Sequence, residues 1–123
     1  GAVIFAKEIE NPERFGVIEF DKNMNAISIE EKPAHPKSKF AQTGLYLYDE
    51  QVFDYIETLK PSERGELEIT DLHTAYLQKS QLQVRVINGA WYDTGTFESM
   101  FKATCAVREL ELKKSGKSDS ITR

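Results

Sequence analysis

Cysteine is nearly absent from this chain, since Cys105 is the single cysteine among 123 residues. An internal disulfide is therefore excluded, and no second ligand residue accompanies Cys105 at the spacing of a metal site. The surrounding segment, ATCAV, is typical of a helix. Because free cysteines are among the most buried residues in proteins, we expect Cys105 to be a buried structural thiol.

Long apolar runs and an excess of positive charge are missing as well. The longest apolar stretches fall far below the roughly 18 residues of a membrane-spanning helix, and no signal peptide is recognisable. The formal net charge of -4 gives no electrostatic reason to expect nucleic acid or an anionic membrane as a partner. With 123 residues, 40% of them hydrophobic, the chain has the size and composition of one soluble globular domain, and we expect it in the cytoplasm.

Several common catalytic motifs are also missing. The sequence contains neither G-x-x-x-x-G-K-[ST] nor G-x-G-x-x-G, so it has no phosphate-cradling loop of its own. No Ser–His–Asp set and no zinc spacing is visible. His35 and His73 lie far apart in the sequence, without an acid and a nucleophile around either. We expect both histidines on the surface or on a helix face, and we assign neither a role.

What the sequence does contain is a mixture of strand and helix patterns. Segments 16–20 and 26–31 alternate apolar and polar residues on either side of a turn rich in Asn and Asp, which predicts a β-hairpin. The opening run, GAVIFA, is typical of a fully buried strand with neighbours on both sides, so we expect the chain to begin inside a larger fold. The predicted strands are 2–9, 16–20, 26–31, 40–48, 82–87 and 90–93.

Three helices are predicted from apolar residues at helical spacing, with Asp49 as the N-cap of the first and Thr96 as the N-cap of the third. The fold class is therefore α/β, a mixed β-sheet with flanking helices, over residues 1–110, followed by a polar, frayed tail at 111–123. The residues expected to be buried are Val52, Phe53, Ile56 and Leu59 in the first helix, Leu72, Tyr76 and Leu77 in the second, and Phe97, Met100, Phe101 and Cys105 in the third.

Charged residues of both signs end one predicted strand, in the segment SIEEKP at 28–33. Glu31 could accept hydrogen bonds from sugar-like hydroxyls, while the ammonium of Lys32 could bind a phosphate as a point charge. Pro33 biases the lysine before it away from helix. The alternative is a solvated strand end with a local ion pair, which is worth under about 1 kcal/mol.

Two other segments place charged groups where a ligand could bind. In RGELEITD, Arg64 precedes a helix, and its guanidinium fork matches the oxygens of a phosphate; Glu66 and Glu68 could instead simply neutralise it. In WYDTGT, Asp93 stands between a predicted strand and a helix, where open α/β sheets bind ligands, and it could hold a divalent cation. The alternative for Asp93 is a turn that joins the two elements.

Five segments occur in an order that resembles one family: PERFGVIEFD, ISIEEKP, PKSKFAQTGLYLYD, LKPSERGELEITDL and WYDTGT. EEKP is shared across sugar nucleotidyltransferases, whereas EEKP, TGLY, RGELEITD and DTGT at these separations form a strong combined signal. From Gly1 to about Leu110 the chain resembles the C-terminal half of the glucose-1-phosphate thymidylyltransferases. The resemblance implies a Rossmann-like fold, Mg²⁺ as cofactor, a homotetrameric parent enzyme, and the formation of dTDP-glucose and pyrophosphate from dTTP and glucose 1-phosphate.

The resemblance also implies which residues would contact the sugar. Gly16 would donate its backbone N–H to the sugar, and Glu31 would accept from the sugar hydroxyls. Gln42 would contact the sugar through its backbone, so that the identity of this side chain should matter little.

The phosphate and the metal would be held by four other residues. Lys32 and Arg64 would be the cations on the sugar phosphate and thus the catalytic residues of this part of the site. Tyr46 would lie near the same phosphate. Asp93 would be one of two carboxylates on the Mg²⁺.

The sequence departs from the family in what it omits. The family's glycine-rich loop, with its catalytic arginine and lysine, and the second Mg²⁺-binding aspartate belong to the N-terminal half. We therefore expect this chain to be a fragment or a separate domain that is inactive alone. Two alternatives stay open: a non-catalytic sugar-phosphate-binding or assembly module, and a related enzyme that uses UTP or CTP.

Overall fold

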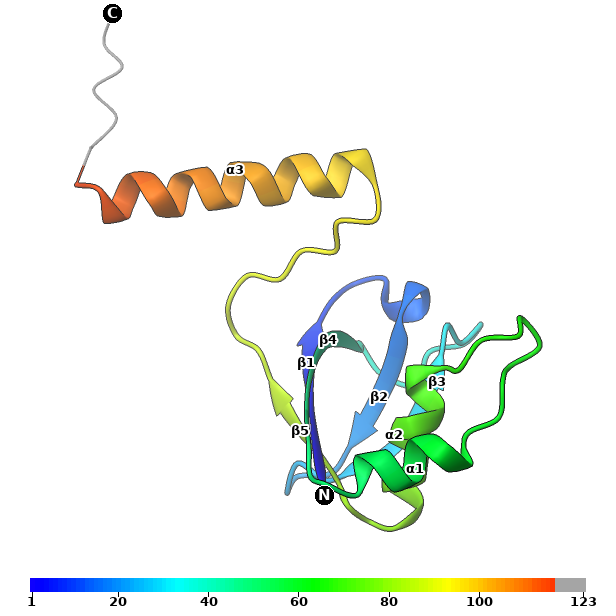
Figure 1. The fold of residues 1–123 in the computed structure, drawn as a ribbon. Helices are drawn as coiled ribbons and strands as arrows, with labels where there is room; N and C mark the ends of the chain where they lie inside the picture. Colours follow the sequence, from blue (N-terminus) through cyan, green and yellow to red (C-terminus); the bar gives the residue numbers. More distant parts are fainter. Residues whose placement is uncertain (117–123) are drawn as a thin grey trace, which may run out of the picture. The chain divides into compact units, whose positions relative to one another are not determined.

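The structure, a computed structural model, describes residues 1–116. It consists of two compact units, Gly1–Gly89 and a second unit that begins at Ala90. The first unit contains the sheet, two α-helices and a short 3-10 helix, η1 (Pro12–Arg14), and the described part of the second contains a loop and one long helix (Figure 1).

The first unit is built on a mixed sheet, as the sequence predicts, with five strands. Its order is β3-β2-β4-β1-β5. β1 lies antiparallel to β4 and parallel to β5, so the opening strand has neighbours on both sides, as its apolar run predicted. The strands are β1 (Ala2–Glu8), β2 (Gly16–Phe20), β3 (Ala26–Glu31), β4 (Phe40–Tyr48) and β5 (Leu82–Val86).

The predicted hairpin is confirmed, with β2 and β3 antiparallel and Gly16 opposite Glu31. Asp21 holds the turn between them, because its Oδ1 accepts the backbone N–H of Asn23 at 2.8 Å and that of Asn25 at 2.9 Å. These hydrogen bonds hold the pKa of Asp21 below its usual value. The register shifts by one residue next to the turn, between Glu19 and Phe20, and is constant from there to the pair of Gly16 and Glu31. This constant part sets which side chains end the hairpin on the far side from the turn.

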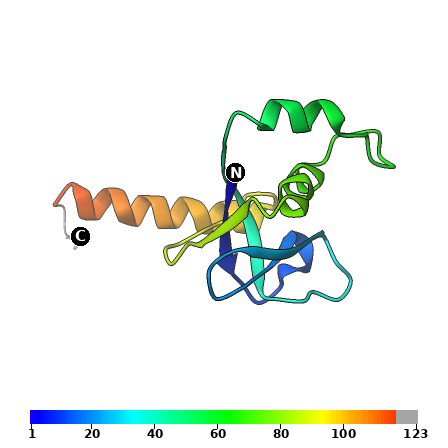
Figure 2. The ribbon, with the colours of Figure 1, turned by 90° about the horizontal axis from the view of Figure 1, so that it is seen from below.

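Two helices, α1 (Val52–Thr58) and α2 (Ile69–Gln78), lie on one side of the sheet (Figures 1 and 2). Leu72 and Tyr76 of α2 are buried, as predicted, and Leu77 is half-buried. Leu72 and Tyr76 belong to the same buried core as apolar side chains of four strands, which comprises Ala2, Ile4, Ala6, Ile18, Ile29, Leu72, Tyr76, Leu82 and Val84.

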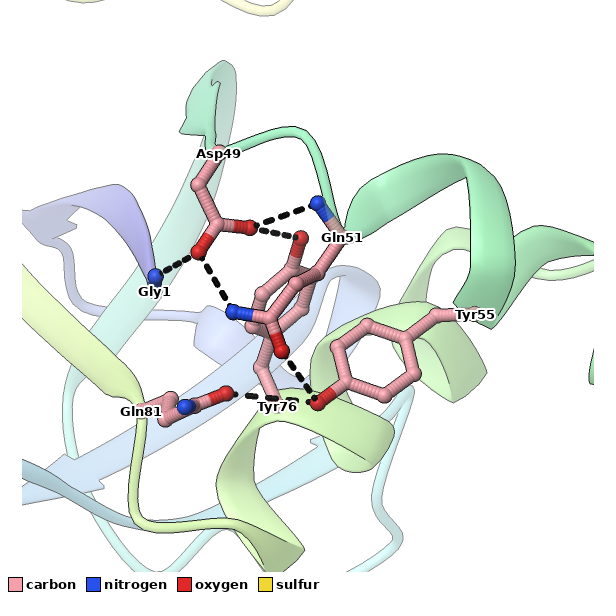
Figure 3. A network of polar contacts seen from close by, with 6 residues as sticks. All are labelled: Gly1, Asp49, Gln51, Tyr55, Tyr76 and Gln81. Atoms are coloured by element: carbon pink, nitrogen blue, oxygen red, sulfur yellow. Dashed lines mark hydrogen bonds and ion pairs between the residues drawn. The ribbon is translucent and has the colours of Figure 1, made fainter.

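The start of α1 differs from the prediction. Asp49 does not cap the helix: α1 begins at Val52 after Gln51, and the carboxylate of Asp49 accepts the backbone N–H of Gln51 at 3.1 Å. The same carboxylate also accepts from the Tyr76 hydroxyl at 2.9 Å and pairs with the ammonium of Gly1 (Figure 3). Asp49 thus ties β4 and α2 together at the entrance of α1.

The buried stripe of α1 is also displaced. Phe53 and Ile56, predicted to be buried, are 70% and 40% exposed. Val52 and Leu59 pack against the core, as predicted, and Tyr55 joins them in place of Phe53 and Ile56. The ring of Tyr55 packs edge-on against Tyr76, with 4.6 Å between the ring centres, and its hydroxyl donates to Gln81 at 3.2 Å (Figure 3). Helical spacing of the apolar residues was compatible with burial of Phe53 and Ile56 or of Tyr55, and in the structure Tyr55 faces the core.

The second unit contains α3 (Phe97–Lys114), which Thr96 caps as predicted. The Ser99 N–H donates to Thr96 Oγ1 at 3.1 Å, and the Thr96 N–H donates to Ser99 Oγ at 3.2 Å. The strand predicted at 90–93 is wrong, because this segment has no regular structure. α3 runs through residue 110, where the predicted domain ended; residues 117–123 of the predicted tail lie outside the described residues.

The apolar stripe predicted on α3 is not buried in the described part of the chain. Phe97 is 90% exposed and Phe101 66%, and Cys105 is exposed as well. The expectation of a buried thiol is therefore wrong here, because residues 90–116 of this unit form one helix and no second element that could cover it. Within residues 1–116, no helix combines the length and the apolar character that a membrane crossing requires.

Candidate functional site

Two segments that are far apart in the sequence meet at one pocket of about 400 Å³. The first is the end of β3, and the second is the loop between α1 and α2. The structure thus brings together Glu31, Lys32 and Arg64, which the sequence placed in two separate clusters. Six residues line the pocket: Glu31, Lys32, Ser62, Glu63, Arg64 and Glu68.

Lys32 has a strained backbone. Its φ of 44° lies in the left-handed region, which a residue with a side chain rarely adopts. The conformation follows directly after β3, and the Lys32 N–H donates to the Phe15 carbonyl at 3.0 Å. Strain of this kind costs on the order of 1–3 kcal/mol and concentrates at binding and catalytic sites. The strain therefore favours the functional interpretation of SIEEKP over a plain strand end.

Arg64 is held by acids in the absence of a ligand. Its Nη2 lies 2.8 Å from Glu68 Oε1 and 3.6 Å from Glu66 Oε2, and Ser62 Oγ donates to the same Glu68 oxygen at 2.9 Å. The hydrogen bond to Arg64 lowers the pKa of Glu68, and it raises that of Arg64. The Arg64 side chain is 65% exposed, and ion pairs that water can reach are weak, so an entering anion can replace the carboxylate.

Glu31 receives a hydrogen bond from α2. The hydroxyl of Thr70 donates to Glu31 Oε2 at 2.6 Å. The other oxygen, Oε1, forms no hydrogen bond within the described part of the chain. Since Glu31 also lines the pocket, this carboxylate can accept hydrogen bonds there.

Gln42 is linked to Glu31 through Thr70, and it makes two hydrogen bonds with its side-chain amide. Its Nε2 donates to Thr70 Oγ1 at 3.2 Å, and its Oε1 lies 3.0 Å from His73 Nδ1. Gln42 is 7% exposed, so both of these bonds are shielded from water. The expectation that the identity of this side chain matters little does not hold for the fold, because a buried amide that loses its partners is destabilising.

His73 is fully buried, which corrects the expectation of a surface or helix-face histidine without a role. Its Nε2 lies 2.7 Å from the Tyr48 hydroxyl. Burial lowers the pKa of His73 to about 4, so the ring is neutral near pH 7. A signal was present in the sequence: Thr70 and His73 are polar residues at helical spacing on the face of α2 that also carries Leu72 and Tyr76.

Gly16 is required by the packing of Gln42. A Cβ at position 16 would lie 2.4 Å from Gln42 Nε2, so no larger residue fits while that amide stays in place. Gly16 faces Glu31 across the hairpin, next to the pocket. The side-chain amide of Gln42 therefore occupies the space that a side chain at position 16 of β2 would fill.

Tyr46 of β4 is half-buried beside this group. Its ring meets His73 edge-on, with 4.6 Å between the ring centres. Burial raises the pKa of Tyr46, and the charge of Glu31 raises it further. The phenol is therefore neutral near pH 7 and can act as a hydrogen-bond donor.

Asp93 belongs to the second unit, whereas all the residues that line the pocket belong to the first. It is half-buried, and its Oδ2 lies 3.2 Å from the place of a Cβ on Gly95. Among residues 1–116, no group of three or more His, Cys, Asp or Glu residues is arranged to hold a metal ion. A metal at Asp93 would therefore need ligands from elsewhere.

Comparisons with known proteins support one family. The family model for nucleotidyl transferases matches residues 1–109. The chain is 50% identical over 113 residues to the glucose-1-phosphate thymidylyltransferase of Neisseria meningitidis, covering 90% of this chain and 39% of that protein. It is 49% identical over 115 residues to the enzyme of the same name from Mycolicibacterium smegmatis, covering 92% and 40%. The chain thus spans about two fifths of the length of the curated relatives it matches.

Solved structures give the same fold. A crystal structure from Bacillus anthracis, described as a glucose-1-phosphate thymidylyltransferase in complex with sucrose, matches with a TM-score of 0.78 and 48% identity, covering 88% of this chain and 44% of that one. The apo UDP-glucose pyrophosphorylase matches with a TM-score of 0.79 at 24% identity, covering 90% and 44%, which shows the fold alone. The fold is therefore of the Rossmann-like nucleotidyltransferase type. With the family model covering most of its length, the chain belongs to the nucleotidyl transferase family.

Proposed function

We propose that this chain is the C-terminal, sugar-phosphate-binding part of a glucose-1-phosphate thymidylyltransferase. One observation carries the proposal: Lys32 and Arg64, from different elements, line the same pocket as Glu31. The pocket volume of about 400 Å³ suits a small polar ligand. Relatives that are about half identical to the chain bear the name of an enzyme that acts on glucose 1-phosphate.

The charges of the pocket match a sugar phosphate. The ammonium of Lys32 provides a point charge, and the guanidinium of Arg64 provides a planar fork for two phosphate oxygens. The carboxylate of Glu31 would accept from the sugar hydroxyls. The backbones of Gly16 and Gln42 and the ring of Tyr46 are the further contacts that we assign to this ligand.

In the proposed reaction an oxygen of glucose 1-phosphate attacks the α-phosphorus of dTTP. A bond forms between that oxygen and the phosphorus, the bond from the phosphorus to the bridging oxygen breaks, and pyrophosphate leaves with the electron pair. The monoester is already anionic near pH 7, so no general base is required. Lys32 and Arg64 contribute by positioning the nucleophile and by balancing its charge.

Asp93 is the residue we assign to Mg²⁺. A single carboxylate is compatible with this ion, because magnesium sites in phosphoryl-transfer enzymes combine one or two carboxylates with phosphate oxygens of the substrate. When bound, Mg²⁺ would neutralise charge on the phosphates. The second carboxylate and the nucleotide-binding residues would come from the remaining three fifths of the parent enzyme, for which we expect a homotetramer.

The test of the sugar-phosphate site is a ¹⁵N–¹H NMR titration of the chain with glucose 1-phosphate. We expect the amides of Gly16, Glu31, Lys32, Gln42 and Arg64 to shift together and to saturate. Lys32→Ala should weaken binding by at least about 10-fold, because a hydrogen bond to a charged group contributes about 1.5–3 kcal/mol.

The matched control is Lys22→Ala, an exposed lysine in the turn at the opposite end of the same hairpin. It should bind like the unmodified chain, and glucose without its phosphate should bind more weakly than glucose 1-phosphate. Equal affinities of the Lys32 and Lys22 variants, or a well-dispersed spectrum that does not respond to millimolar ligand, would contradict the proposal.

A second prediction concerns turnover. Incubated with dTTP, glucose 1-phosphate and Mg²⁺, the chain alone should release no pyrophosphate above the blank, because it contains no phosphate-cradling loop for the nucleotide. A phosphate-release assay coupled to pyrophosphatase measures this directly. Pyrophosphate formation that depends on both substrates would show that the chain carries a complete active site.

One observation favours the alternative of an assembly module. Leu45 and Leu47 of β4 are 52% and 57% exposed, and apolar side chains of this size on a sheet are suited to pairing with another chain. Size-exclusion chromatography with light scattering separates the two functions. A stable dimer that does not bind glucose 1-phosphate would favour assembly over the sugar-phosphate site.

A further inference from the structure

A continuous line of hydrogen bonds runs from the core to the pocket. It passes from Tyr48 to His73, then to Gln42, then to Thr70, and ends on Glu31. The distances between the bonded atoms along this line are 2.7, 3.0, 3.2 and 2.6 Å. Three elements contribute to it: β4 supplies Gln42 and Tyr48, α2 supplies Thr70 and His73, and β3 supplies Glu31.

The ionised carboxylate at the pocket end decides the direction of every bond in this line. A carboxylate can only accept, so the single hydroxyl hydrogen of Thr70 points to Glu31. The Thr70 oxygen then has only lone pairs left and must accept from the amide nitrogen of Gln42. The amide oxygen of Gln42 consequently faces His73.

The same argument determines which ring nitrogen of His73 carries the proton. Because the Gln42 oxygen can only accept, the proton of the His73 ring sits on Nδ1. Nε2 is then the acceptor for the Tyr48 hydroxyl. This arrangement requires a neutral His73 ring, and the complete burial of His73 favours the neutral form. A charged imidazolium would have no acid among its two direct partners, Gln42 and Tyr48.

We propose that Thr70 is a positioning residue that holds Glu31 in one orientation towards the pocket, and that Gln42 and His73 keep the Thr70 hydroxyl directed at it. The inference rests on the proposed function for its ligand, because the oriented carboxylate is the acceptor for the sugar hydroxyls. A glutamate at an exposed strand end would otherwise sample several rotamers, and a ligand would have to immobilise it on binding.

The first test needs no ligand. In the free chain, we expect side-chain ³J couplings to show one dominant χ1 and χ2 rotamer for Glu31, and imidazole ¹⁵N shifts to show the proton of His73 on Nδ1. Thr70→Val keeps the shape of the residue and removes the hydroxyl, so the Glu31 couplings should become rotamer-averaged. Thr70→Ser should restore the single rotamer.

The matched control is Thr74→Val, the same substitution one helical turn further along α2. The hydroxyl of Thr74 donates to the Thr70 carbonyl at 2.8 Å and takes no part in the line that ends on Glu31. This variant should leave the Glu31 couplings unchanged. It also reports how much helix stability alone affects them.

The second test separates the positioning role from the proposed function. With glucose 1-phosphate as the probe, Thr70→Val should raise the Kd by about 3- to 10-fold, since the ligand must then order the Glu31 side chain on binding. With inorganic phosphate as the probe, the Kd should stay the same, because Lys32 and Arg64 bind the phosphate. Thr70→Ser should bind both probes like the unmodified chain.

The outcomes of the two tests distinguish the positioning role of Thr70 from a general structural role and from failure of the proposed function. An averaged Glu31 in the unmodified chain, or couplings that Thr70→Val does not change, would overturn the positioning role. An ordered Glu31 that loses its order in Thr70→Val, in a chain that binds neither probe, would uphold the positioning role and contradict the proposed function. Equal losses for both probes in Thr70→Val would assign to Thr70 a general structural role and overturn the proposal.

Discussion

Lowering the pH from 7 to 4 should destabilise the folded chain by about 3 kcal/mol through His73 alone. Its pKa falls from 6.5 to about 4 on folding, and each unit of difference corresponds to about 1.4 kcal/mol. The unfolded chain binds a proton at this histidine as the pH falls through 6.5, whereas the folded chain resists protonation until about pH 4. Protonation of His73 therefore leaves the free energy of unfolding unchanged above pH 6.5 and lowers it progressively between pH 6.5 and about 4.

Urea unfolding of the unmodified chain and of His73→Asn, measured at several pH values, checks this result. The carboxylates titrate in both proteins, so the contribution of His73 is the difference between their two pH profiles. His35→Asn is the matched control, because His35 is the other of the two histidines and is exposed. Parallel profiles for the unmodified chain and His73→Asn would show that the buried ring does not resist protonation.

Replacing Gly16 by alanine should destabilise the chain by about 2–4 kcal/mol. The new Cβ would lie 2.4 Å from Gln42 Nε2 and 2.7 Å from its Cδ. The amide must move, which strains the packing by about 1–3 kcal/mol and leaves the polar atoms of Thr70 or His73 without their partner. The same shift should disorder Glu31, which stands opposite Gly16 in the hairpin.

A double-mutant cycle gives this prediction its sharpest test. Once Gln42→Ala has removed the amide, Gly16→Ala should add little further destabilisation, because the space is then open. Gly89→Ala is the control, since a Cβ there meets no atom within 4 Å. If Gly16→Ala costs as much in the Gln42→Ala background as in the unmodified chain, the close approach of the two residues is not the cause.

The sequence predicted the sheet well, because apolar and polar residues alternate with a period of two along a strand that has one buried face. This pattern marked β2 and β3, and the Asn- and Asp-rich turn marked the hairpin that joins them. It failed at 90–93, where a short run rich in aromatic residues carries no alternation and folds without regular structure. Helical spacing found all three helices, but the face that each one buries depends on what packs against it. Phe53 and Cys105 were therefore predicted to be buried, although both are exposed.

The candidate site was predictable in parts. Charges at the end of β3 and before α2 were visible in the sequence, yet only the packing of α2 beside β3 brings Lys32 and Arg64 to one pocket. The partners of Gln42 were not predictable, because polar contacts between distant segments leave no periodicity. The sequence marked Glu31 as a candidate acceptor for sugar hydroxyls, but it gave no sign of the link from Glu31 through Thr70 to the buried Gln42.

The left-handed backbone of Lys32 has a consequence for how this chain can change. Glycine adopts that conformation without strain, so glycine at position 32 relieves a cost that lysine imposes. A selection for heat resistance alone would favour that replacement, and each chain it enriched would have lost a cation from the pocket. Resistance to heat and the proposed binding of an anion thus favour different amino acids at this one position.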